Sequence, residues 1–148
     1  MLEAARTKLA AAGLVDRVAF VQGRLTDLDT TLYDAAILSL VLHFVLDNGE
    51  KQAFLREIAV RLQPGAPLVV FDPQLEPEQE DALLRWLSGQ GHAVAAANAI
   101  VSRARTQWHC VTSARLAELL ESAGFLTPRQ IFKAFNYVAT FATRADTS

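Results

Sequence analysis

His43 is the residue of this sequence that could move a proton, and Asp72 could face the same cleft. Each follows an apolar run: His43 comes directly after residues 35–42, and Asp72 directly after residues 68–71. A histidine side chain titrates near neutral pH, with a pKa of ~6.5, and can act as a general base. Two structural interpretations stay open beside this one, because His43 can be a cap or a packing residue and Asp72 can cap the turn that follows it.

The sequence predicts neither a metal site nor an internal disulfide. Its single cysteine is Cys110, and no spacing of cysteine and histidine resembles a zinc site. A chain without a disulfide favours a reducing compartment, so we expect a cytoplasmic protein.

Length and composition indicate one globular domain over residues 1–148. Hydrophobic residues make up 51% and charged residues 20%, which excludes intrinsic disorder. There are 14 basic and 16 acidic residues, and this net charge of −2 gives no positive field that would indicate nucleic acid. The longest apolar runs fall short of the ~20 residues that cross a bilayer, and Glu3 stands where a signal peptide would be apolar, so neither membrane insertion nor export is expected.

The first half of the chain predicts alternating helices and strands. Apolar spacing favours a helix over residues 2–12, and β-branched and aromatic alternation favours a strand over residues 17–22. Residues 35–42, apart from Ser39, and residues 68–71 are apolar, as in buried parallel strands. An amphipathic helix from about residue 50 to 62 joins them. Strand, helix and strand make a βαβ crossover.

The second half predicts three helices and a closing pair of strands. Residues 76–88 and 93–104 favour helices, and they lie within a helical insertion over residues 76–112 that we expect to cover a cleft. Ser113 can cap a further helix that ends before Gly124. Aromatic and β-branched alternation around Asn136 is consistent with an antiparallel pair or one long bent strand.

Four segments in this order resemble class I S-adenosylmethionine-dependent methyltransferases. They are residues 17–23, 33–47, 61–72 and 113–125, and the last resembles the helix that precedes the family's terminal antiparallel strands. The resemblance implies an α/β fold with a Rossmann-like sheet flanked by helices and C-terminal antiparallel strands. It also implies S-adenosylmethionine as the cofactor. The methyl acceptor does not follow from the fold, on which small molecules, proteins and tRNA are all methylated, and a small molecule is the partner that we expect.

Two parts of the family pattern are not found. The family holds its cofactor with a glycine-rich turn and a ribose-binding acid, yet no Gly-x-Gly precedes residues 17–22 and residues 1–5 resemble the helix just after that acid. The fold is therefore expected to be N-terminally truncated, without the first two family strands. Either Met1 is an internal methionine of a longer protein, or the short form is real and its open sheet is closed by pairing residues 17–22 with residues 35–42 or by a homodimer.

The resemblance also assigns candidate site residues. The loop that borders the adenine corresponds to Arg24, Leu25 and Asp27, which can equally be a solvated polar loop. Ser39 and Leu40 correspond to positions near the methionine part and the sulfonium, since ligands of open α/β sheets lie beyond the carboxyl ends of the strands.

His43 would then lie at the mouth of the site toward the acceptor, as a candidate catalytic base. Trp108, His109 and Cys110 could line an acceptor pocket, although such residues are more often part of a core, and they receive no role. Tyr137 and its aromatic neighbours are expected to close the core, with stacking on an acceptor as the alternative.

The function expected is methyl transfer from S-adenosylmethionine to an unidentified acceptor, with the cofactor site completed by an N-terminal part or a second chain. The alternative is a non-catalytic remnant of the same fold that serves in self-association or partner binding.

Overall fold

The computed structural model describes residues 2–76 and 79–146, and the chain divides into two compact units. The first unit, residues 1–30, contains helix α1 (Leu2–Ala11) and two short 3-10 helices, Val15–Arg17 and Leu25–Asp27. None of the residues of α1 is buried. The second unit, residues 31–148, contains the sheet and all other helices of the described residues.

The strand expected over residues 17–22 is not formed. Residues 15–17 make a 3-10 helix, and residues 18–22 carry no regular secondary structure. A strand needs a hydrogen-bonded neighbour, and none of the described strands pairs with this segment. Val18 and Val21 accordingly remain 39% and 54% exposed.

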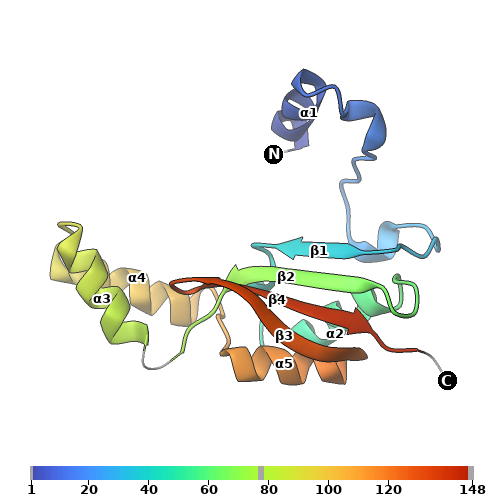
Figure 1. Ribbon diagram of the computed structural model, residues 1–148. Helices are drawn as coiled ribbons and strands as arrows, with labels where there is room; N and C mark the ends of the chain where they lie inside the picture. Colours follow the sequence, from blue (N-terminus) through green and yellow to red (C-terminus); the bar gives the residue numbers. More distant parts are fainter. Residues whose placement is uncertain (1, 77–78, 147–148) are drawn as a thin grey trace. The chain divides into compact units, whose positions relative to one another are not determined.

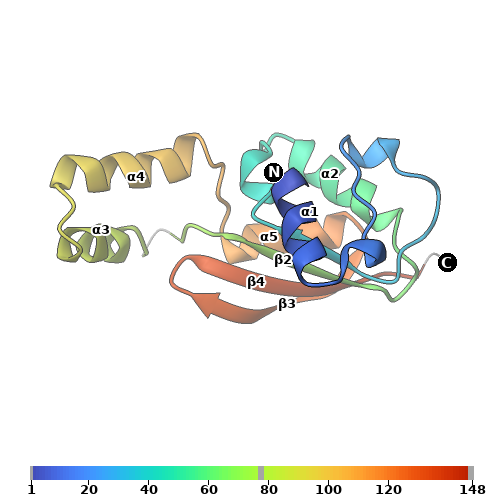
Figure 2. The ribbon, with the colours of Figure 1, turned by 90° about the horizontal axis from the view of Figure 1, so that it is seen from above.

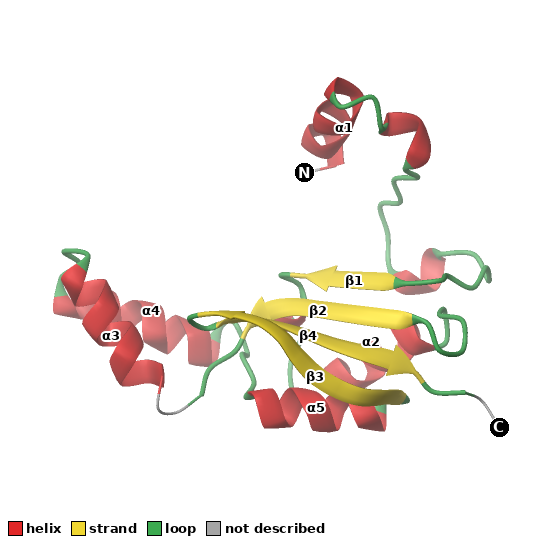
Figure 3. Ribbon diagram, in the orientation of Figure 1, coloured by secondary structure: helices red, strands yellow, loops and turns green. Residues whose placement is uncertain are grey.

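The second unit contains a four-stranded sheet in the order β1-β2-β4-β3 (Figures 1 and 3). The strands are β1 (Ala36–Ser39), β2 (Pro67–Pro73), β3 (Phe125–Ala134) and β4 (Tyr137–Arg144). β1 and β2 are parallel, as the predicted crossover requires, and β4 is antiparallel to both β2 and β3. The expected closing antiparallel pair is confirmed, and β3 begins at Phe125, earlier than its aromatic alternation indicates.

One face of the sheet packs against two helices. The register aligns Leu38 with Val70, and Val70 with Thr140, so these three side chains share a face. Helices α2 (Glu50–Ala59) and α5 (Ser113–Ser122) lie against this face (Figures 1 and 2). Their buried leucines and isoleucine complete the core: Leu55, Ile58, Leu116, Leu119 and Leu120.

The expected helices 76–88 and 93–104 are observed as α3 (Gln79–Gly89) and α4 (Val94–Thr106). The two helices lie side by side (Figures 1 and 2), around a small apolar cluster of their own. Residues 77–78, inside the expected first helix, lie outside the described residues. No helix in the described ranges has the length and apolarity to cross a membrane.

The start of α5 differs by one residue from the expectation. Thr112, not Ser113, is the N-cap, because its side chain accepts a hydrogen bond from the Arg115 backbone N–H. Ser113 is the first helical residue, and its hydroxyl donates instead to Oε1 of Gln74 at 2.5 Å. The N-cap is therefore the residue whose side chain reaches the free backbone N–H groups of the first turn, and here that residue is Thr112.

Candidate functional site

β1 ends in an unusual backbone conformation at Leu40. Its φ is +55°, in the left-handed region that non-glycine residues rarely adopt, while its N–H donates to the Phe71 carbonyl at 2.8 Å. This turn sends the chain away from the sheet into a 3-10 helix over Leu42–Phe44. Strained backbone of this kind clusters at functional sites. Ser39 and Leu40 are both exposed at this end of the strand.

His43 and Asp72 form a buried pair across the ends of β1 and β2. Nδ1 of His43 lies 2.9 Å from Oδ1 of Asp72, and the two residues are 7% and 5% exposed. Burial raises the pKa of Asp72, against the opposite effect of its hydrogen bond with His43. In the tautomer with the proton on Nδ1, His43 donates to Asp72 and its Nε2 can accept a proton. The sequence placed both residues at the sheet edge, and the structure adds that they contact each other.

A cavity of about 230 Å³ opens beside this pair. Its walls are apolar or aromatic apart from His43, and they come from the end of β1, the end of β2, the segment after α4 and the start of β4. The lining residues are Leu40, His43, Phe44, Pro73, Trp108 and Tyr137. The rings of His43 and Trp108 meet edge to face, with centroids 6.0 Å apart. Of the residues expected at an acceptor pocket, Trp108 therefore does line a cavity.

Lys51 is a buried positive charge near the pair, and sequence reasoning missed it. Its side chain is 1% exposed, and its Nζ donates to the carbonyls of Val45 and His109, the latter at 2.9 Å. Burial lowers the pKa of Lys51, opposed by the charges of Asp47 and Asp72. The ammonium group thus ties the segment after His43 to the segment that carries Trp108.

A signal for Lys51 was present in the sequence. It precedes Leu55 and Ile58 by four and seven residues, so it lies on the buried stripe of α2. A lysine in the apolar register of an amphipathic helix indicates an inward-pointing amine that needs carbonyl or carboxylate partners.

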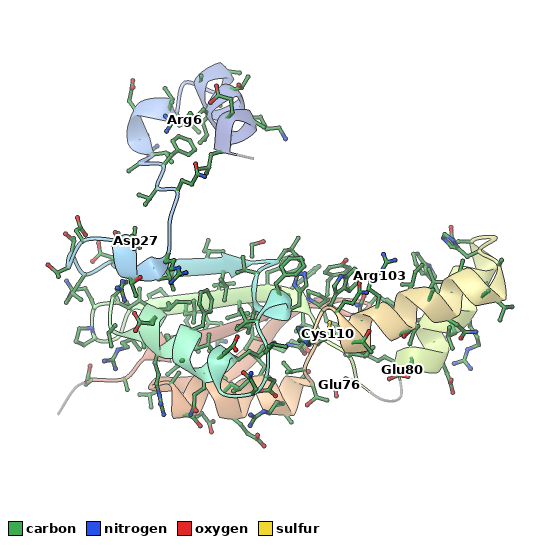
Figure 4. All side chains as sticks on the ribbon, turned by 180° about the vertical axis from the view of Figure 1, so that it is seen from behind. Arg6, Asp27, Glu76, Glu80, Arg103 and Cys110 are labelled. Atoms are coloured by element: carbon green, nitrogen blue, oxygen red, sulfur yellow. The ribbon has the colours of Figure 1, made fainter. Side chains whose placement is uncertain are left out.

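Cys110 is partly buried between α4 and α5 (Figure 4). Burial, followed by the negative charge of Asp72, raises the pKa of its thiol to about 11 from an ordinary 9.0. At pH 8 the thiolate population of the folded protein is then about 100-fold below that of a free cysteine. Cys110 is therefore poorly suited to act as a nucleophile.

We expect Cys110 of the folded protein to react with iodoacetamide about 100-fold more slowly at pH 8 than in urea-unfolded protein. The rate should continue to rise between pH 9 and pH 11, because the reactive thiolate forms only there. Quenched mass spectrometry over a pH series measures this rate. Equal rates in folded and unfolded protein at pH 8 would contradict the assignment.

The other predicted cofactor residues lie in the first unit. Arg24 and Asp27 are exposed and Leu25 is half-buried. The Arg24 backbone N–H donates to Oδ2 of Asp27 at 2.7 Å, which closes a tight turn (Figure 4 labels Asp27). A Cβ on Gly23 would come within 2.6 Å of that same oxygen, so a larger residue there would displace the Asp27 carboxylate. Asp27 thus has a local structural role, and its predicted contact with adenine stays a prediction.

The structure places Ser39, Leu40 and His43 together at one end of β1. Asp72 and Trp108 lie beside His43 there. Arg24, Leu25 and Asp27 form the turn of the first unit. Nowhere within residues 2–76 and 79–146 do three histidine, cysteine or acidic side chains gather in a way that could hold a metal ion.

Comparisons with known proteins agree with this fold. A family model described as a methyltransferase domain matches residues 1–70. The mitomycin 7-O-methyltransferase MmcR has a TM-score of 0.70 and 22% identity, over 97% of this chain and 39% of that chain. An O-methyltransferase family 2 protein from Planctomyces limnophilus, in complex with apigenin, has a TM-score of 0.71 and 14% identity, over 97% and 40% of the two chains.

Human N-acetylserotonin methyltransferase in complex with SAM has a TM-score of 0.62 and 20% identity, over 88% of this chain and 35% of that chain. No curated protein matches the sequence. This chain spans 35–40% of the length of these three solved structures. The chain therefore has the fold of these methyltransferases, as the resemblance drawn from its sequence implies.

Proposed function

We propose that this chain takes part in methyl transfer from S-adenosylmethionine to a hydroxyl group of a small molecule, with His43 as the general base. The observation that carries the proposal is the buried His43–Asp72 pair beside an apolar cavity at the carboxyl ends of two parallel strands. The solved structures of similar fold support oxygen as the nucleophile, because several of them are named O-methyltransferases.

The residues around this cavity fit the reactive end of the cofactor. A sulfonium is a cation, and the faces of Trp108 and Tyr137 can stabilise it by cation–π interaction. We assign Leu40 and Ser39 to the methionine part, while the adenine contact of Arg24, Leu25 and Asp27 stays a prediction from the family resemblance. When bound, S-adenosylmethionine supplies an electrophilic methyl group whose bond to sulfur breaks as the bond to the acceptor oxygen forms.

The chain's own residues then have distinct roles. His43 accepts the hydroxyl proton at Nε2, because Nδ1 is engaged with Asp72. Asp72 holds the ring in this tautomer and stabilises the imidazolium that forms. The apolar walls exclude water, which strengthens both electrostatic interactions. Alignment of the acceptor oxygen with the methyl group supplies the remaining rate enhancement, because two reactants held in line react in an effectively unimolecular step.

Calorimetric titration of S-adenosylhomocysteine into the 148-residue chain tests the proposal, and we expect binding in the micromolar range. Leu40→Asn should weaken binding about tenfold, because it removes an apolar wall of the cavity. Asparagine tolerates the left-handed backbone at this position better than leucine, so the variant should fold. The matched control is Val60→Asn, at an exposed position that does not line this cavity.

No binding of millimolar S-adenosylhomocysteine by a well-folded sample would contradict the proposal for this chain. Equal losses in Leu40→Asn and Val60→Asn would contradict the assignment of Leu40 to the cofactor.

A second candidate function, self-association of a non-catalytic chain, is favoured by exposed apolar side chains on the face of the sheet opposite α2 and α5. Ile37 on β1 is 77% exposed and Phe132 on β3 is 53% exposed. β1 is also an edge strand, and its outer side pairs with no strand of the described residues. We infer that this surface would form a homodimer contact. The mass in solution, determined on the calorimetric sample, distinguishes the two candidates: a dimer without ligand binding favours this one.

A further inference from the structure

A second and larger cavity lies next to the one at His43. Its volume is about 410 Å³, and the residues that line it come from α3, α4, the segment after α4 and the turn between β3 and β4. We propose that this cavity binds the body of the methyl acceptor and that the acceptor is an uncharged aromatic ring system. This inference rests on the proposed function, since it names the substrate class for the same site.

The two cavities share two wall residues. Trp108 and Tyr137 line both of them, so a single molecule can extend from the larger cavity to the smaller. The Trp108 ring also meets the His43 ring edge to face at 6.0 Å. A flat molecule held against Trp108 would therefore present one edge to His43.

The walls of the larger cavity select against charge. None of its described lining residues is of an acidic or basic type. Four of them are aromatic: Trp86, Trp108, Phe135 and Tyr137. A charged ligand would lose its hydration here without gaining a partner. Aromatic walls favour flat aromatic ligands, because offset and edge-to-face ring contacts add to the burial of apolar surface.

One polar group and one fixed turn complete the cavity. Asn136 is 9% exposed and lines it, and its backbone carbonyl accepts the Gln74 N–H at 2.7 Å. Phe135 has a φ of +59°, and its ring lies 5.8 Å from that of Trp86. The side-chain amide of Asn136 can therefore bind a polar substituent of the ligand, and the ring of Phe135 lies against Trp86 of α3. A pocket of ~300–1,000 Å³ with few polar groups is typical of small-molecule sites.

The test titrates 2-naphthol, an uncharged aromatic alcohol, into the 148-residue chain without cofactor. We expect a Kd of roughly 0.1–1 mM for a ligand of this size. Naphthalene-2-sulfonate, of similar shape with a negative charge, should bind at least about tenfold more weakly, and cyclohexanol should not bind measurably. Equal affinity for the sulfonate would overturn the assignment of an uncharged ligand.

Two variants locate the binding. Trp86→Ala should weaken the binding of 2-naphthol about tenfold and leave the binding of S-adenosylhomocysteine unchanged. The reason is that Trp86 lines the larger cavity but not the smaller one at His43. The residue is 54% exposed, so the variant should fold. Trp86→Phe should restore most of the affinity, and Val94→Ala, at an exposed position on α4, is the control.

Absence of 2-naphthol binding by a folded sample, or equal binding by Trp86→Ala, would overturn the inference. Binding of 2-naphthol without binding of S-adenosylhomocysteine would leave this cavity assigned and contradict only the proposed methyl transfer.

Discussion

Replacing His43 with glutamine is expected to slow methyl transfer by about 10²- to 10⁴-fold, the usual contribution of a general base. Glutamine keeps a hydrogen-bonding group near Asp72 but cannot take up the hydroxyl proton. Binding of S-adenosylhomocysteine should change little, because the imidazole acts on the acceptor and not on the cofactor.

The measurement is release of S-adenosylhomocysteine with a panel of hydroxylated aromatic compounds, starting from 2-naphthol. His92→Gln is the matched control, because His92 is exposed in the turn between α3 and α4. A His43→Gln variant that keeps the wild-type rate would show that alignment alone drives the reaction. Loss of S-adenosylhomocysteine binding together with the rate would assign His43 to cofactor binding instead.

Replacing Lys51 with methionine is expected to destabilise the fold by about 2–5 kcal/mol. Methionine fills a similar volume, but it leaves the carbonyls of the half-buried Val45 and His109 without this donor, at up to about 1–3 kcal/mol each. Part of this cost is offset, because the variant no longer buries an ammonium group, whose desolvation already lowers the pKa of Lys51.

Urea unfolding monitored by circular dichroism measures the change. Lys133→Met, at an exposed position of β3, is the control and should stay within about 0.5 kcal/mol of wild type. If Lys51→Met were equally stable, the two carbonyls would have to find other donors, and Lys51 would not be what fixes the Trp108 segment.

Much of the sheet could be predicted from local pattern. Residues 35–42, apart from Ser39, and residues 68–71 are apolar, which is typical of strands covered by helices, and both segments contribute to a parallel pair in the structure. The length of the first strand could not be read in this way. β1 stops at Ser39 because the chain turns at Leu40, and no glycine marks that turn.

Residues 17–22 show the limit of such patterns. Their alternation is a strand signal, yet a strand exists only where a neighbour supplies hydrogen bonds, and that depends on contacts distant in the sequence. The candidate site was also predictable only in part. The sequence predicts that His43 and Asp72 each lie at the end of a strand. Their 2.9 Å contact and the burial of Lys51 depend on how α2 and the segment after α4 pack together.

The separate apolar cluster of α3 and α4 has a consequence for how acceptor selectivity can change. Leu83, Leu87, Ala97 and Val101 pack on one another, while the sheet has its own core beneath α2 and α5. Substitutions in regions that share no contacts have nearly additive effects on stability. Apart from the Trp86–Phe135 contact, the core of the helical pair can therefore be changed by mutation with little effect on the strands that carry His43 and Asp72, so under the proposed function the acceptor cavity can change independently of that pair.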